Sequence, residues 1–574
     1  MTPAAPVGRG GMNRPPIREE LSSLLVQALE KSGHGHSPVD SATSFEIPRE
    51  ERFGDLSTNV VFRLAKEKKK APRAMAEGVV KSLEALIAAS SAKDRIARVA
   101  VEGPGFINFY YSSQEIAEVI SKIKKEGAEF GRPRLGSKKN ILLEFVSANP
   151  TGPLTVAHGR QAALGDSLAR ILSFCGHKVT KEYYNNDEGV QIETLGKSAH
   201  LWLRKQLYNE NPEFPENFYR GQYLEATTGN LIRLKGVALK KMDAESQIKA
   251  CQDFAKEDIL KGIKKDLEDF GVRFDHFYSQ EKLGKSTKVE KTLEALKKKN
   301  VVYEKDGALW FRSTDFGDDK DRVLIKSDKS YTYLTPDIAY HEEKFQRGFD
   351  TLINIWGPDH HGYIARLKAS QTALGHDPER IHILIAQLVT LYEGKKQVRM
   401  STRAGEFVTL REILDEVGKD AGRFFFLMRK FDAHLDFDLA LAKSQTPDNP
   451  VFYIQYAHAR IESIKALCLE KGVSISWKDM NCVSRLSEPS EIQLMRHLSA
   501  YESTLSGAER TLEPYRLVEY LKDLAASFHR FYTDHRVVTE DASLTQGRLM
   551  LSVSVQTVLR SGLELLGVSA PLKM

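Results

Sequence analysis

The sequence predicts a multidomain α/β protein, in which a parallel-sheet domain with a helical insertion follows a small α+β domain and precedes an all-α helical bundle. Three observations predict this arrangement. The chain has 574 residues, which is more than one hydrophobic core usually holds. Its middle part alternates strand-like and helix-like segments, and from Asn449 onward only helical periodicity remains.

The composition is that of a globular protein. Hydrophobic residues make up 41% and charged residues 28% of the chain, and 83 Lys and Arg against 77 Asp and Glu give a net charge of +6. No apolar run approaches the ~20 residues of a membrane span, so we expect no membrane segment. Two basic runs, Lys66–Lys70 and Lys297–Lys299, are typical of solvated helix faces but also permit a polyanionic partner.

The few cysteines bear on the compartment and on metal binding. None of the four lies in a Cys-x-x-Cys pair, which argues against a zinc site and against a disulfide framework. This usage favours a reducing cytoplasm. The four are Cys175, Cys251, Cys468 and Cys482.

The amino-terminal part predicts the small α+β domain. Residues 1–15 are rich in Pro and Gly and contain no acids, and we expect them to be a disordered leader. The domain itself is expected over 16–125. An amphipathic helix over 17–33 opens it, a turn and a second amphipathic helix occupy 53–70, and strand-like segments over 99–112 close it.

Residues 126–410 predict the parallel-sheet domain. A strand over 140–147 is followed by a helix with one apolar face and, after Gly176, by a second strand over 178–184. Glycine suits the left-handed conformation that ends many helices. Strand, helix and strand in this order form a βαβ unit, which has parallel strands. The apolar face consists of Leu164, Leu168, Ile171 and Leu172.

An insertion is expected between the two halves of the sheet domain, at about 191–300, because these residues are helix-rich and highly charged. Strand-like segments then return and are expected to complete the sheet domain. They are residues 308–313, 321–326, 351–357 and 381–391.

The last part of the chain predicts helices only. Thr409 and Glu412 fit a capping box, so a helix should start there and begin a connecting helical segment over 411–448. The terminal helical domain is expected over 449–574. Its first helix carries an apolar stripe at alternating spacings of three and four, formed by Ile454, Ala457, Ile461, Ile464 and Cys468.

A rigid turn follows the first predicted strand of the parallel sheet. It reads NPTGPLTVAHGR and includes Pro150, Gly152, His158 and Gly159. In open parallel sheets, ligands bind beyond the carboxyl ends of the strands, where the next helix directs its unpaired amides outward. The glycines permit close approach to a ligand, and His158 is able to donate to a phosphate oxygen, which favours phosphoryl or nucleotidyl transfer. A structural turn with an ordinary helix-start histidine is the alternative.

A second stretch, residues 391–410, predicts a strand, a flexible basic loop and the capped helix. With Gly405 as a hinge, such a loop is able to close over a triphosphate and neutralise the leaving pyrophosphate. Taken alone, it is equally typical of a basic surface loop. Its functional side chains would be Lys395, Lys396, Arg399, Ser401 and Arg403.

Two further stretches offer binding groups. In YLTPD, Thr335 predicts an N-cap and Pro336 the first helical residue, so Asp337 falls in the first turn with Tyr333 in reach. A carboxylate there suits a guanidinium, or it simply complements the helix dipole.

The stretch WGPDHHGY again follows a strand, and its Asp359 is expected to accept hydrogen bonds from ribose hydroxyls. Its adjacent histidines lack a third nearby ligand, so no metal site is predicted.

Together these stretches resemble the two ATP motifs of class I aminoacyl-tRNA synthetases, with Thr155–His158 as the HIGH motif and Arg399–Arg403 as the KMSKS motif. Further blocks narrow the resemblance to arginyl-tRNA synthetases, and together they span nearly everything after the leader. They are GDLSTNVVFRLAK, VEGPGFINF, SANPTGPL, EYYNNDEGVQI, SYTYLTPDIAYHEEKF, WGPDHHGYIARLKA, RMSTRAGEFVTLREILDEVG, NPVFYIQYAHARI and LLGVSAPLKM.

The resemblance implies a Rossmann-like catalytic domain, an amino-terminal domain that contacts tRNA and an anticodon-binding carboxyl-terminal domain. It implies an enzyme that activates L-arginine with ATP to arginyl-adenylate and transfers it to the 3′ end of tRNA-Arg, releasing AMP and pyrophosphate. Mg²⁺ is expected to arrive with ATP. Family members usually need bound tRNA for activation, and a cytoplasmic monomer is expected.

The resemblance also assigns roles to residues. Catalytic roles fall to His158, Thr155, Arg399, Ser401 and Arg403. Arginine is expected to contact Ser147, Asn149, His158, Tyr333, Asp337 and His360. ATP is expected to contact Pro150, Gly152, His158, Gly159, Gly357, Asp359, Met400 and Ser401. Tyr453, Tyr456 and Arg460 are expected to contact tRNA, although plain helix packing explains these three equally well.

Both ATP motifs depart from the family pattern. Thr155 replaces a histidine, while Arg399 and Thr402 replace the two lysines of the second motif. We expect Arg403, Lys395 or Lys396 to supply the missing positive charge. The departures also keep two other functions open, namely another nucleotidyl transferase of this fold and an RNA-binding protein without enzymatic activity.

Overall fold

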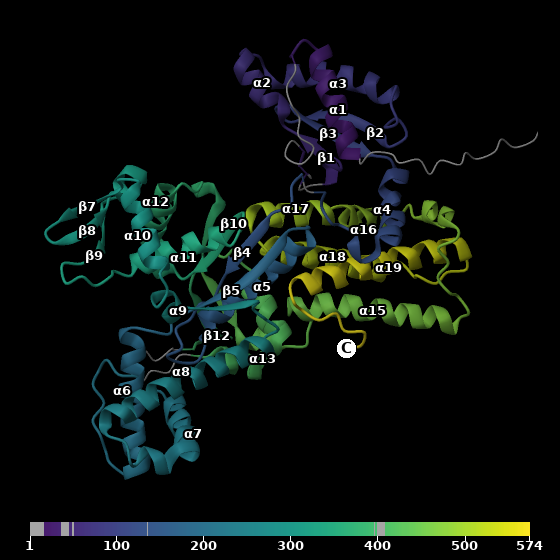
Figure 1. Cartoon of the computed structure of the whole chain (residues 1–574). Coiled ribbons are helices and arrows are strands. Elements are labelled where there is room, and N and C mark those ends of the chain that lie inside the picture. Colours follow the sequence, from purple (N-terminus) through teal and green to yellow (C-terminus); the bar gives the residue numbers. More distant parts are fainter. Residues whose placement is uncertain are drawn as a thin grey trace, which may run out of the picture. The chain divides into compact units, whose positions relative to one another are not determined.

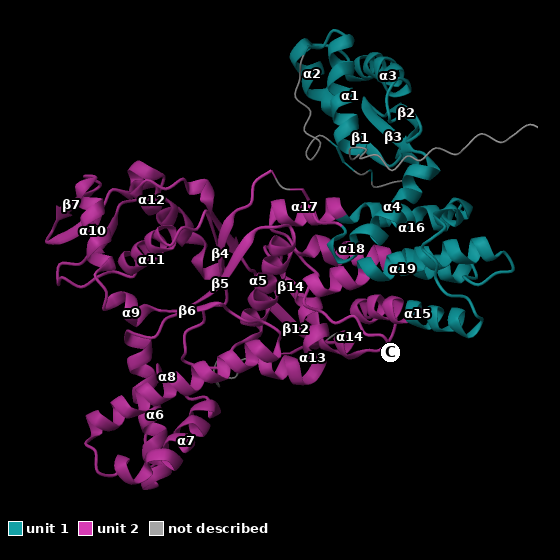
Figure 2. Ribbon diagram, turned by 45° about the vertical axis from the view of Figure 1, so that its right-hand side comes forward, with its two compact units in different colours: residues 1–130, 461–501, 526–558 teal, residues 131–460, 502–525, 559–574 magenta. Residues whose placement is uncertain are grey.

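The computed structural model describes residues 17–35, 45–46, 48, 51–134, 136–394, 396–398 and 408–574. The chain divides into two compact units (Figure 2). Unit 1 comprises residues 1–130, 461–501 and 526–558, and unit 2 comprises 131–460, 502–525 and 559–574. None of the described helices is long and apolar enough to cross a lipid bilayer.

The amino-terminal part of unit 1 is an α+β structure, as predicted. Its sheet is antiparallel with the order β1-β3-β2, and α1 and α3 contribute most of the buried apolar side chains. The Arg95 guanidinium joins α1 to α4 through ion pairs of 2.8 Å with Glu20 and 2.7 Å with Glu115. The elements are α1 (Ile17–Lys31), η1 (Glu51–Phe53), β1 (Leu56–Thr58), α2 (Val60–Lys68), α3 (Pro72–Ala88), β2 (Ile96–Glu102), β3 (Phe106–Tyr111), α4 (Ser113–Glu126) and η2 (Gly127–Glu129).

The carboxyl-terminal part of the chain is helical, which confirms that prediction. All five residues of the predicted apolar stripe on α15 are buried. In unit 1, a buried ion pair of 2.7 Å between Arg548 and Glu491 joins α19 to α16. The elements are α15 (Pro450–Glu470), η6 (Met480–Arg485), α16 (Pro489–Ser499), α17 (Tyr501–Thr511), α18 (Tyr515–Asp534) and α19 (Ala542–Leu565).

Unit 2 is built on a five-stranded parallel sheet with the order β11-β10-β4-β5-β6. Figure 1 labels its three middle strands, β10, β4 and β5. The predicted βαβ unit is confirmed: α5 (Val156–Phe174) connects β4 to β5, its apolar face is buried, and Gly176 has φ +106°. The chain adds strands on one side of β4 and later on the other, so the order reverses between β4 and β10. The strands are β4 (Asn140–Glu144), β5 (Lys178–Asn185), β6 (His276–Ser279), β10 (Thr351–Trp356) and β11 (Ile381–Ile385).

The stretch predicted as a helical insertion contains α6 (Val190–Tyr208), α7 (Gln222–Leu239) and α8 (Ala244–Asp269). It also contains β6, which pairs with β5 as the edge strand of the parallel sheet. This strand was not predicted, because four residues between charged helices show no clear period. Two short helices follow it, α9 (Gln280–Gly284) and α10 (Lys288–Lys298).

Two of the strands expected in the parallel sheet lie elsewhere. Residues 308–313 and 321–326 supply β8 (Ala308–Phe311) and β9 (Arg322–Ile325), which form a separate antiparallel sheet with β7 (Val302–Lys305). The prediction was wrong because the turn between β7 and β8 is a tight hairpin. Asp306 and Gly307 both have positive φ, +53° and +73°, the backbone that an Asp-Gly hairpin turn requires.

The remaining elements of unit 2 precede, connect or follow the last two strands of the parallel sheet, β10 and β11. The predicted Thr409–Glu412 capping box is confirmed at the start of α13, but Gly418 with φ +78° interrupts that helix. β12 pairs with β13 and β14 in a small mixed sheet. The elements are η3 (Ser313–Phe316), α11 (Leu334–Gln346), η4 (Pro358–Tyr363), α12 (Ile364–Leu374), η5 (Pro378–Arg380), β12 (Val389–Glu393), β13 (Lys396–Gln397), α13 (Leu410–Phe426), β14 (Leu435–Asp438) and α14 (Leu439–Lys443).

Candidate active site

The candidate site lies at the carboxyl edge of the parallel sheet, where the strand order reverses. The turn before α5 follows β4, and η4 follows β10. The helix α11 leads into the amino end of β10, so its own first turn lies at the opposite, carboxyl edge. Three of the predicted stretches therefore converge where an open parallel sheet binds its ligands.

The turn after β4 has a strained backbone. Val146 and Ser147 have φ of +68° and +42°, although neither is glycine and valine is β-branched. The Ser147 amide donates to the Phe145 carbonyl at 3.0 Å, which closes a three-residue turn. Strain of this kind costs roughly 1–3 kcal/mol per residue and persists only where neighbours hold it, as is common at binding sites.

The neighbours of Ser147 hold this turn. Its hydroxyl donates to Glu144 Oε1 at 3.1 Å and accepts from the Tyr184 amide at 3.1 Å. Tyr183 Oη donates to the Ala148 carbonyl at 2.7 Å. Side chains from β4 and β5 thereby fix the segment that carries Asn149.

The next residues face α6 and α7. The Asn149 side-chain amide donates to Gln191 Oε1 at 2.5 Å. Tyr223 Oη donates to the Thr151 carbonyl at 2.6 Å, and a Cβ on Gly152 would lie 3.4 Å from the Tyr223 ring. The predicted contacts of Asn149 with arginine and of Pro150 and Gly152 with ATP stay predictions.

His158 is a neutral hydrogen-bond donor at the start of α5. The Thr155 amide donates to its Nδ1 at 3.1 Å, so the ring proton resides on Nε2. Burial lowers the pKa of His158 to about 4, which keeps the imidazole uncharged at neutral pH. An uncharged Nε2–H suits a phosphate oxygen, as the sequence suggested.

The segment after the basic loop is joined to this helix start. The Val156 amide donates to the Val408 carbonyl at 3.1 Å, and the Leu410 amide donates to the Leu154 carbonyl at 2.8 Å. The amino ends of α5 and α13 therefore lie side by side. A Cβ on Gly159 would come within 3.0 Å of Leu410, so this glycine has a packing role between the helices, while its predicted ATP contact stays a prediction.

The second ATP motif is not part of what the structure describes. Lys395 and residues 399–407 lie outside the described residues. The predictions for Arg399, Met400, Ser401, Thr402, Arg403 and Gly405 therefore stay predictions from sequence.

Asp337 lies in the first turn of α11, as predicted, but with different neighbours. The helix begins at Leu334, so Thr335 is not its N-cap; the Thr335 hydroxyl donates instead to the Leu324 carbonyl at 2.7 Å. Tyr333 is 78% exposed. The hydroxyl that donates to Asp337 Oδ2, at 2.6 Å, belongs to Tyr363 at the end of η4.

Asp337 is a partly buried carboxylate with little positive charge around it among the described residues. Burial raises its pKa to about 6, against the opposing hydrogen bond from Tyr363; nearby Glu144 raises it further and Lys344 lowers it. Lys344 itself forms an ion pair with another carboxylate, because its ammonium lies 2.5 Å from Glu144 Oε2. Close to neutral pH the site thus presents an ionised oxygen pair that favours a cation.

A buried polar network contacts the backbone carbonyl of Asp337. Lys344, with no exposed surface, also donates to Asn354 Oδ1 at 3.1 Å. The Asn354 amide nitrogen lies 2.9 Å from His341 Nε2, and His341 Nδ1 lies 2.9 Å from the Asp337 carbonyl oxygen. Sequence reasoning missed this network. Its signal was the spacing of Asp337, His341 and Lys344, which places three polar residues on one helix face.

The stretch after β10 forms the open side of the site. A Cβ on Gly357 would come 2.7 Å from Asp359 Oδ1, which is the end of an exposed side chain that is able to move aside, so packing alone does not require glycine there. Asp359 and His360 form a 3.4 Å pair with side chains 78% and 55% exposed, free to meet a ligand. Their predicted roles toward ribose and arginine stay predictions. Within the described part of the chain, no three His, Cys, Asp or Glu side chains are grouped to hold a metal ion.

The three residues predicted to contact tRNA lie on α15 and are half-buried. The Arg460 guanidinium lies 4.4 Å from the centroid of the Tyr456 ring and donates to the Tyr456 hydroxyl. The predicted contacts of Tyr453, Tyr456 and Arg460 with tRNA stay predictions.

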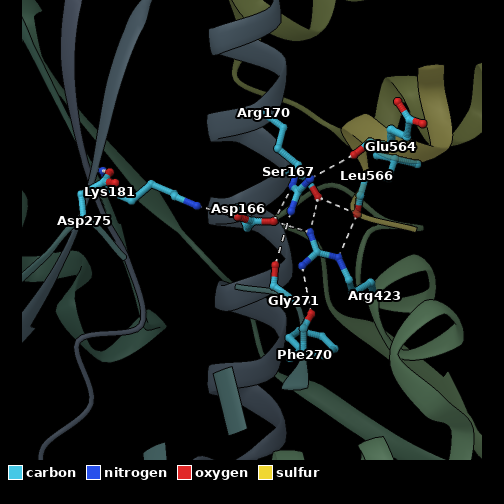
Figure 3. A network of polar contacts seen from close by, with 10 residues as sticks. All are labelled: Asp166, Ser167, Arg170, Lys181, Phe270, Gly271, Asp275, Arg423, Glu564 and Leu566. Atoms are coloured by element: carbon cyan, nitrogen blue, oxygen red, sulfur yellow. Dashed lines mark hydrogen bonds and ion pairs between the residues drawn. The ribbon is translucent and has the colours of Figure 1, made fainter. Parts of the chain in front are cut away.

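A second buried carboxylate, Asp166 on α5, lies in a dense network (Figure 3). Arg423 of α13, which has no exposed surface, donates to Asp166 Oδ2 at 2.8 Å and to the carbonyls of Phe270 and Leu566 at 3.2 and 2.9 Å. Lys181 and Arg170 also contact the carboxylate, at 3.0 and 2.7 Å. The network ties together α5, α13, the end of α8 and the end of α19.

Three family models match successive parts of the chain. The arginyl tRNA synthetase N terminal domain matches residues 19–111, the class I (R) tRNA synthetase catalytic domain matches 119–428, and the DALR anticodon binding domain matches 454–574. The catalytic model alone spans more than half of the chain.

Similar proteins agree with these models. The chain is 46% identical to the arginine–tRNA ligase of Syntrophotalea carbinolica over 97% of this chain and 100% of that protein. It is 44% identical to that of a Geobacter species, also over 97% and 100%. The Thermus thermophilus arginyl-tRNA synthetase structure, 23% identical, superposes with a TM-score of 0.76 over 97% of this chain and 100% of that one, which supports the fold. The chain belongs to the arginyl-tRNA synthetase family of class I.

Proposed function

We propose that this protein is an arginine–tRNA ligase, which activates L-arginine with ATP and transfers the arginyl group to the 3′-terminal ribose of tRNA-Arg. The observation that carries the proposal is Asp337, a partly buried carboxylate that accepts a hydrogen bond from a neutral tyrosine hydroxyl. It lies at the same sheet edge as His158. A cation-binding group beside a phosphate-binding helix start is what joining arginine to a nucleotide requires.

ATP is proposed to bind where the strand order reverses. The amino end of α5 directs the positive end of the helix dipole toward the phosphates, and the neutral His158 supports a hydrogen bond to a phosphate oxygen without adding charge. Thr155, Pro150, Gly152 and Gly159 are proposed to line the phosphates. Gly357 and Asp359 are proposed to contact the adenosine.

In the first step, an arginine carboxylate oxygen attacks the α-phosphorus of ATP. The new bond joins that oxygen to phosphorus, the bond from phosphorus to the bridging oxygen of the β-phosphate breaks, and pyrophosphate leaves with the electron pair. Mg²⁺ comes bound to ATP as part of the substrate. Negative charge grows on the leaving group, so Arg399, Ser401, Arg403 and the Met400 backbone are proposed to stabilise it.

The basic loop allows a ranking of its cations. We expect Arg403→Ala to slow activation more than Lys396→Ala, because Arg403 occupies the motif and Lys396 precedes it. Pyrophosphate exchange in the presence of tRNA measures both variants. Normal exchange in Arg403→Ala together with loss in Lys396→Ala would reverse the ranking.

Arginine is proposed to place its guanidinium on Asp337 and its α-amino group near Ser147 and Asn149. The Asn149 amide donates to Gln191 in the structure, so binding arginine would exchange that hydrogen bond for one to the substrate. Tyr333 and His360, both exposed, are proposed to close the pocket.

In the second step, the arginyl group passes from the adenylate to a ribose hydroxyl of tRNA, and AMP leaves. The α+β domain and the terminal helices are proposed to contact tRNA, the latter through Tyr453, Tyr456 and Arg460. A monomer in the cytoplasm, where four buried free cysteines stay reduced, completes the proposal.

One assay tests the function. The protein is incubated with ATP, Mg²⁺, labelled arginine and total tRNA, and charged tRNA is counted, with lysine in place of arginine as the control. We expect charging with arginine only. Pyrophosphate release that does not depend on RNA would favour another nucleotidyl transferase, and RNA binding without either reaction would favour a non-enzymatic role.

A further inference from the structure

We propose that Tyr363 is a positioning residue for arginine: its hydroxyl holds Asp337 Oδ2, so that the other carboxylate oxygen is presented to the guanidinium. The inference rests on the proposed function, since it gives the partner of Asp337 a role in the same site. The geometry carries it. The distance from Tyr363 Oη to Asp337 Oδ2 is 2.6 Å, across 26 residues of sequence.

The tyrosine ring is itself held in place. Its edge meets Trp356 at the end of β10, with 6.1 Å between ring centroids and 72° between planes. On another side, the Arg366 guanidinium lies 5.0 Å from the ring centroid. Because β10 and α12 fix the ring, the hydroxyl is able to fix the rotation of the carboxylate, which otherwise has a broad terminal torsion.

A tyrosine orients this carboxylate without neutralising it. Burial and the neighbouring Asp337 hold the pKa of Tyr363 well above its usual value, so the phenol stays a neutral donor. A lysine or arginine in its place would cancel the negative charge and compete with the substrate cation. Glu144 differs in this respect, because Lys344 at 2.5 Å already balances its charge. Asp337, with a neutral donor, keeps its negative charge for the substrate cation.

The other groups that face Asp337 are few in the described structure. They are Glu144 from β4, Tyr184 from β5 and Lys344 on α11 itself, while His341 contacts the Asp337 backbone. Of these, Glu144 and Lys344 neutralise each other. The hydroxyl of Tyr363 is therefore the group whose removal should change the carboxylate most directly.

The test is Tyr363→Phe, which removes one oxygen and keeps the ring. Arginine affinity is measured by calorimetry from pH 5 to 8, and charging of tRNA gives kcat and KM. We expect the Kd and KM for arginine to rise roughly tenfold or more, since the carboxylate loses the charge-assisted hydrogen bond that orients it. The kcat at saturating arginine and the KM for ATP should stay within about twofold.

The pH dependence separates positioning from a merely structural role. The Tyr363 hydroxyl favours the ionised carboxylate, so its loss should move the midpoint of arginine binding to higher pH. The matched control is Tyr303→Phe, which removes a hydroxyl that donates to Asp321 Oδ2 at 3.0 Å on the β7-β8-β9 sheet. That variant should leave arginine affinity and the midpoint unchanged.

The outcomes are distinct. Wild-type affinity and an unmoved midpoint in folded Tyr363→Phe, with Asp337→Asn clearly impaired, would overturn this inference and leave the proposed function intact. A wild-type protein that neither binds arginine nor charges tRNA would overturn the proposed function itself. Circular dichroism and the melting temperature confirm that the variant is folded. Where arginine binds too weakly for calorimetry, the protons released on adding saturating arginine at each pH give the midpoint of the pH dependence.

Discussion

Asp166 is a fully buried carboxylate and Asp337 a partly buried carboxylate of the same unit, and their surroundings are opposite. Asp166 contacts three cations, Arg423, Lys181 and Arg170, at 2.7–3.0 Å. In the part of the chain that the structure describes, the Asp337 carboxylate accepts its hydrogen bond from a neutral tyrosine. A carboxylate whose negative charge is balanced by several cations holds helices together. A carboxylate without such cations is available to bind a ligand that brings the positive charge.

The pKa values express the same difference. Burial alone raises the pKa of Asp166, but its three cations outweigh burial and hold the pKa below its usual value. Burial also raises the pKa of Asp337, and there the hydrogen bond does not outweigh it, which leaves the pKa at about 6. Burial raises the pKa at both sites, so the nearby positive charge decides whether the carboxylate has a structural role or is available to bind a ligand.

The largest expected effect is on stability, in Arg423→Met. Removing this guanidinium leaves Asp166 with a weaker counter-charge and two buried carbonyls without their donor, so the free energy of unfolding should fall by about 3–5 kcal/mol. Urea denaturation followed by circular dichroism measures it. Arg411→Met on the same helix is the control, because its pairs with Asp266 and Asp269 are partly exposed and should contribute no more than about 1 kcal/mol. Equal losses in both variants would contradict the assigned role of Arg423.

The next effect is on binding, in Asp337→Asn. The arginine cation loses its counter-charge, so binding should weaken by at least about 2 kcal/mol, or some 30-fold. Stability should not fall, since the substitution removes a partly buried charge that has no cationic partner among the described residues. Calorimetry measures the arginine affinity of the variant, and a urea titration measures its free energy of unfolding. A destabilised variant with normal arginine affinity would give Asp337 the structural role that is assigned here to Asp166.

A smaller effect separates the two carboxylates by pH. Asp337 has a raised pKa, so below about pH 6 it takes up a proton and the Kd for arginine should rise up to tenfold per pH unit. Asp166 has a lowered pKa, so its contribution to stability is present above the unfolded pKa and is lost only as the pH falls through the lower folded value. Between pH 7 and 5 arginine affinity should therefore fall while the Arg423→Met stability difference stays constant. A flat affinity profile would contradict this.

The smallest effect concerns Tyr333, the partner that the sequence suggested for Asp337. Because the ring is 78% exposed, Tyr333→Ala should change the free energy of unfolding by less than about 0.5 kcal/mol. If the ring closes over bound arginine, as proposed, the KM for arginine should still rise several-fold. An unchanged KM would show that Tyr333 does not contact bound arginine.

Local patterns in the sequence predicted the elements that depend on neighbouring residues. The apolar period of α5 and the capping box at Thr409 follow from spacings of three or four residues. The position of Asp337 in a first helical turn was predicted from the adjacent Pro336, although the helix begins one residue before the expected N-cap. The hairpin between β7 and β8 also had such a signal in Asp306-Gly307, but the apolar content of the strands suggested the parallel sheet.

The rest depended on contacts between distant parts of the chain. Tyr363 reaches Asp337 only because η4 and α11 meet at the sheet edge, and Lys344 pairs with Glu144 across 200 residues. The positive φ of Val146 has no local cause in the sequence, since a β-branched residue avoids it, and it exists because Tyr183 and Tyr184 hold the turn.

The central claim is tested most directly by comparing arginine with citrulline, which has nearly the same shape but a neutral urea group. Calorimetry at pH 7.5 gives the affinity of both ligands for the wild-type protein and for Asp337→Asn. The undercompensated carboxylate predicts a strong preference for arginine in the wild type that nearly disappears in Asp337→Asn. An unchanged preference in the variant would show that some other group supplies the charge that recognises guanidinium.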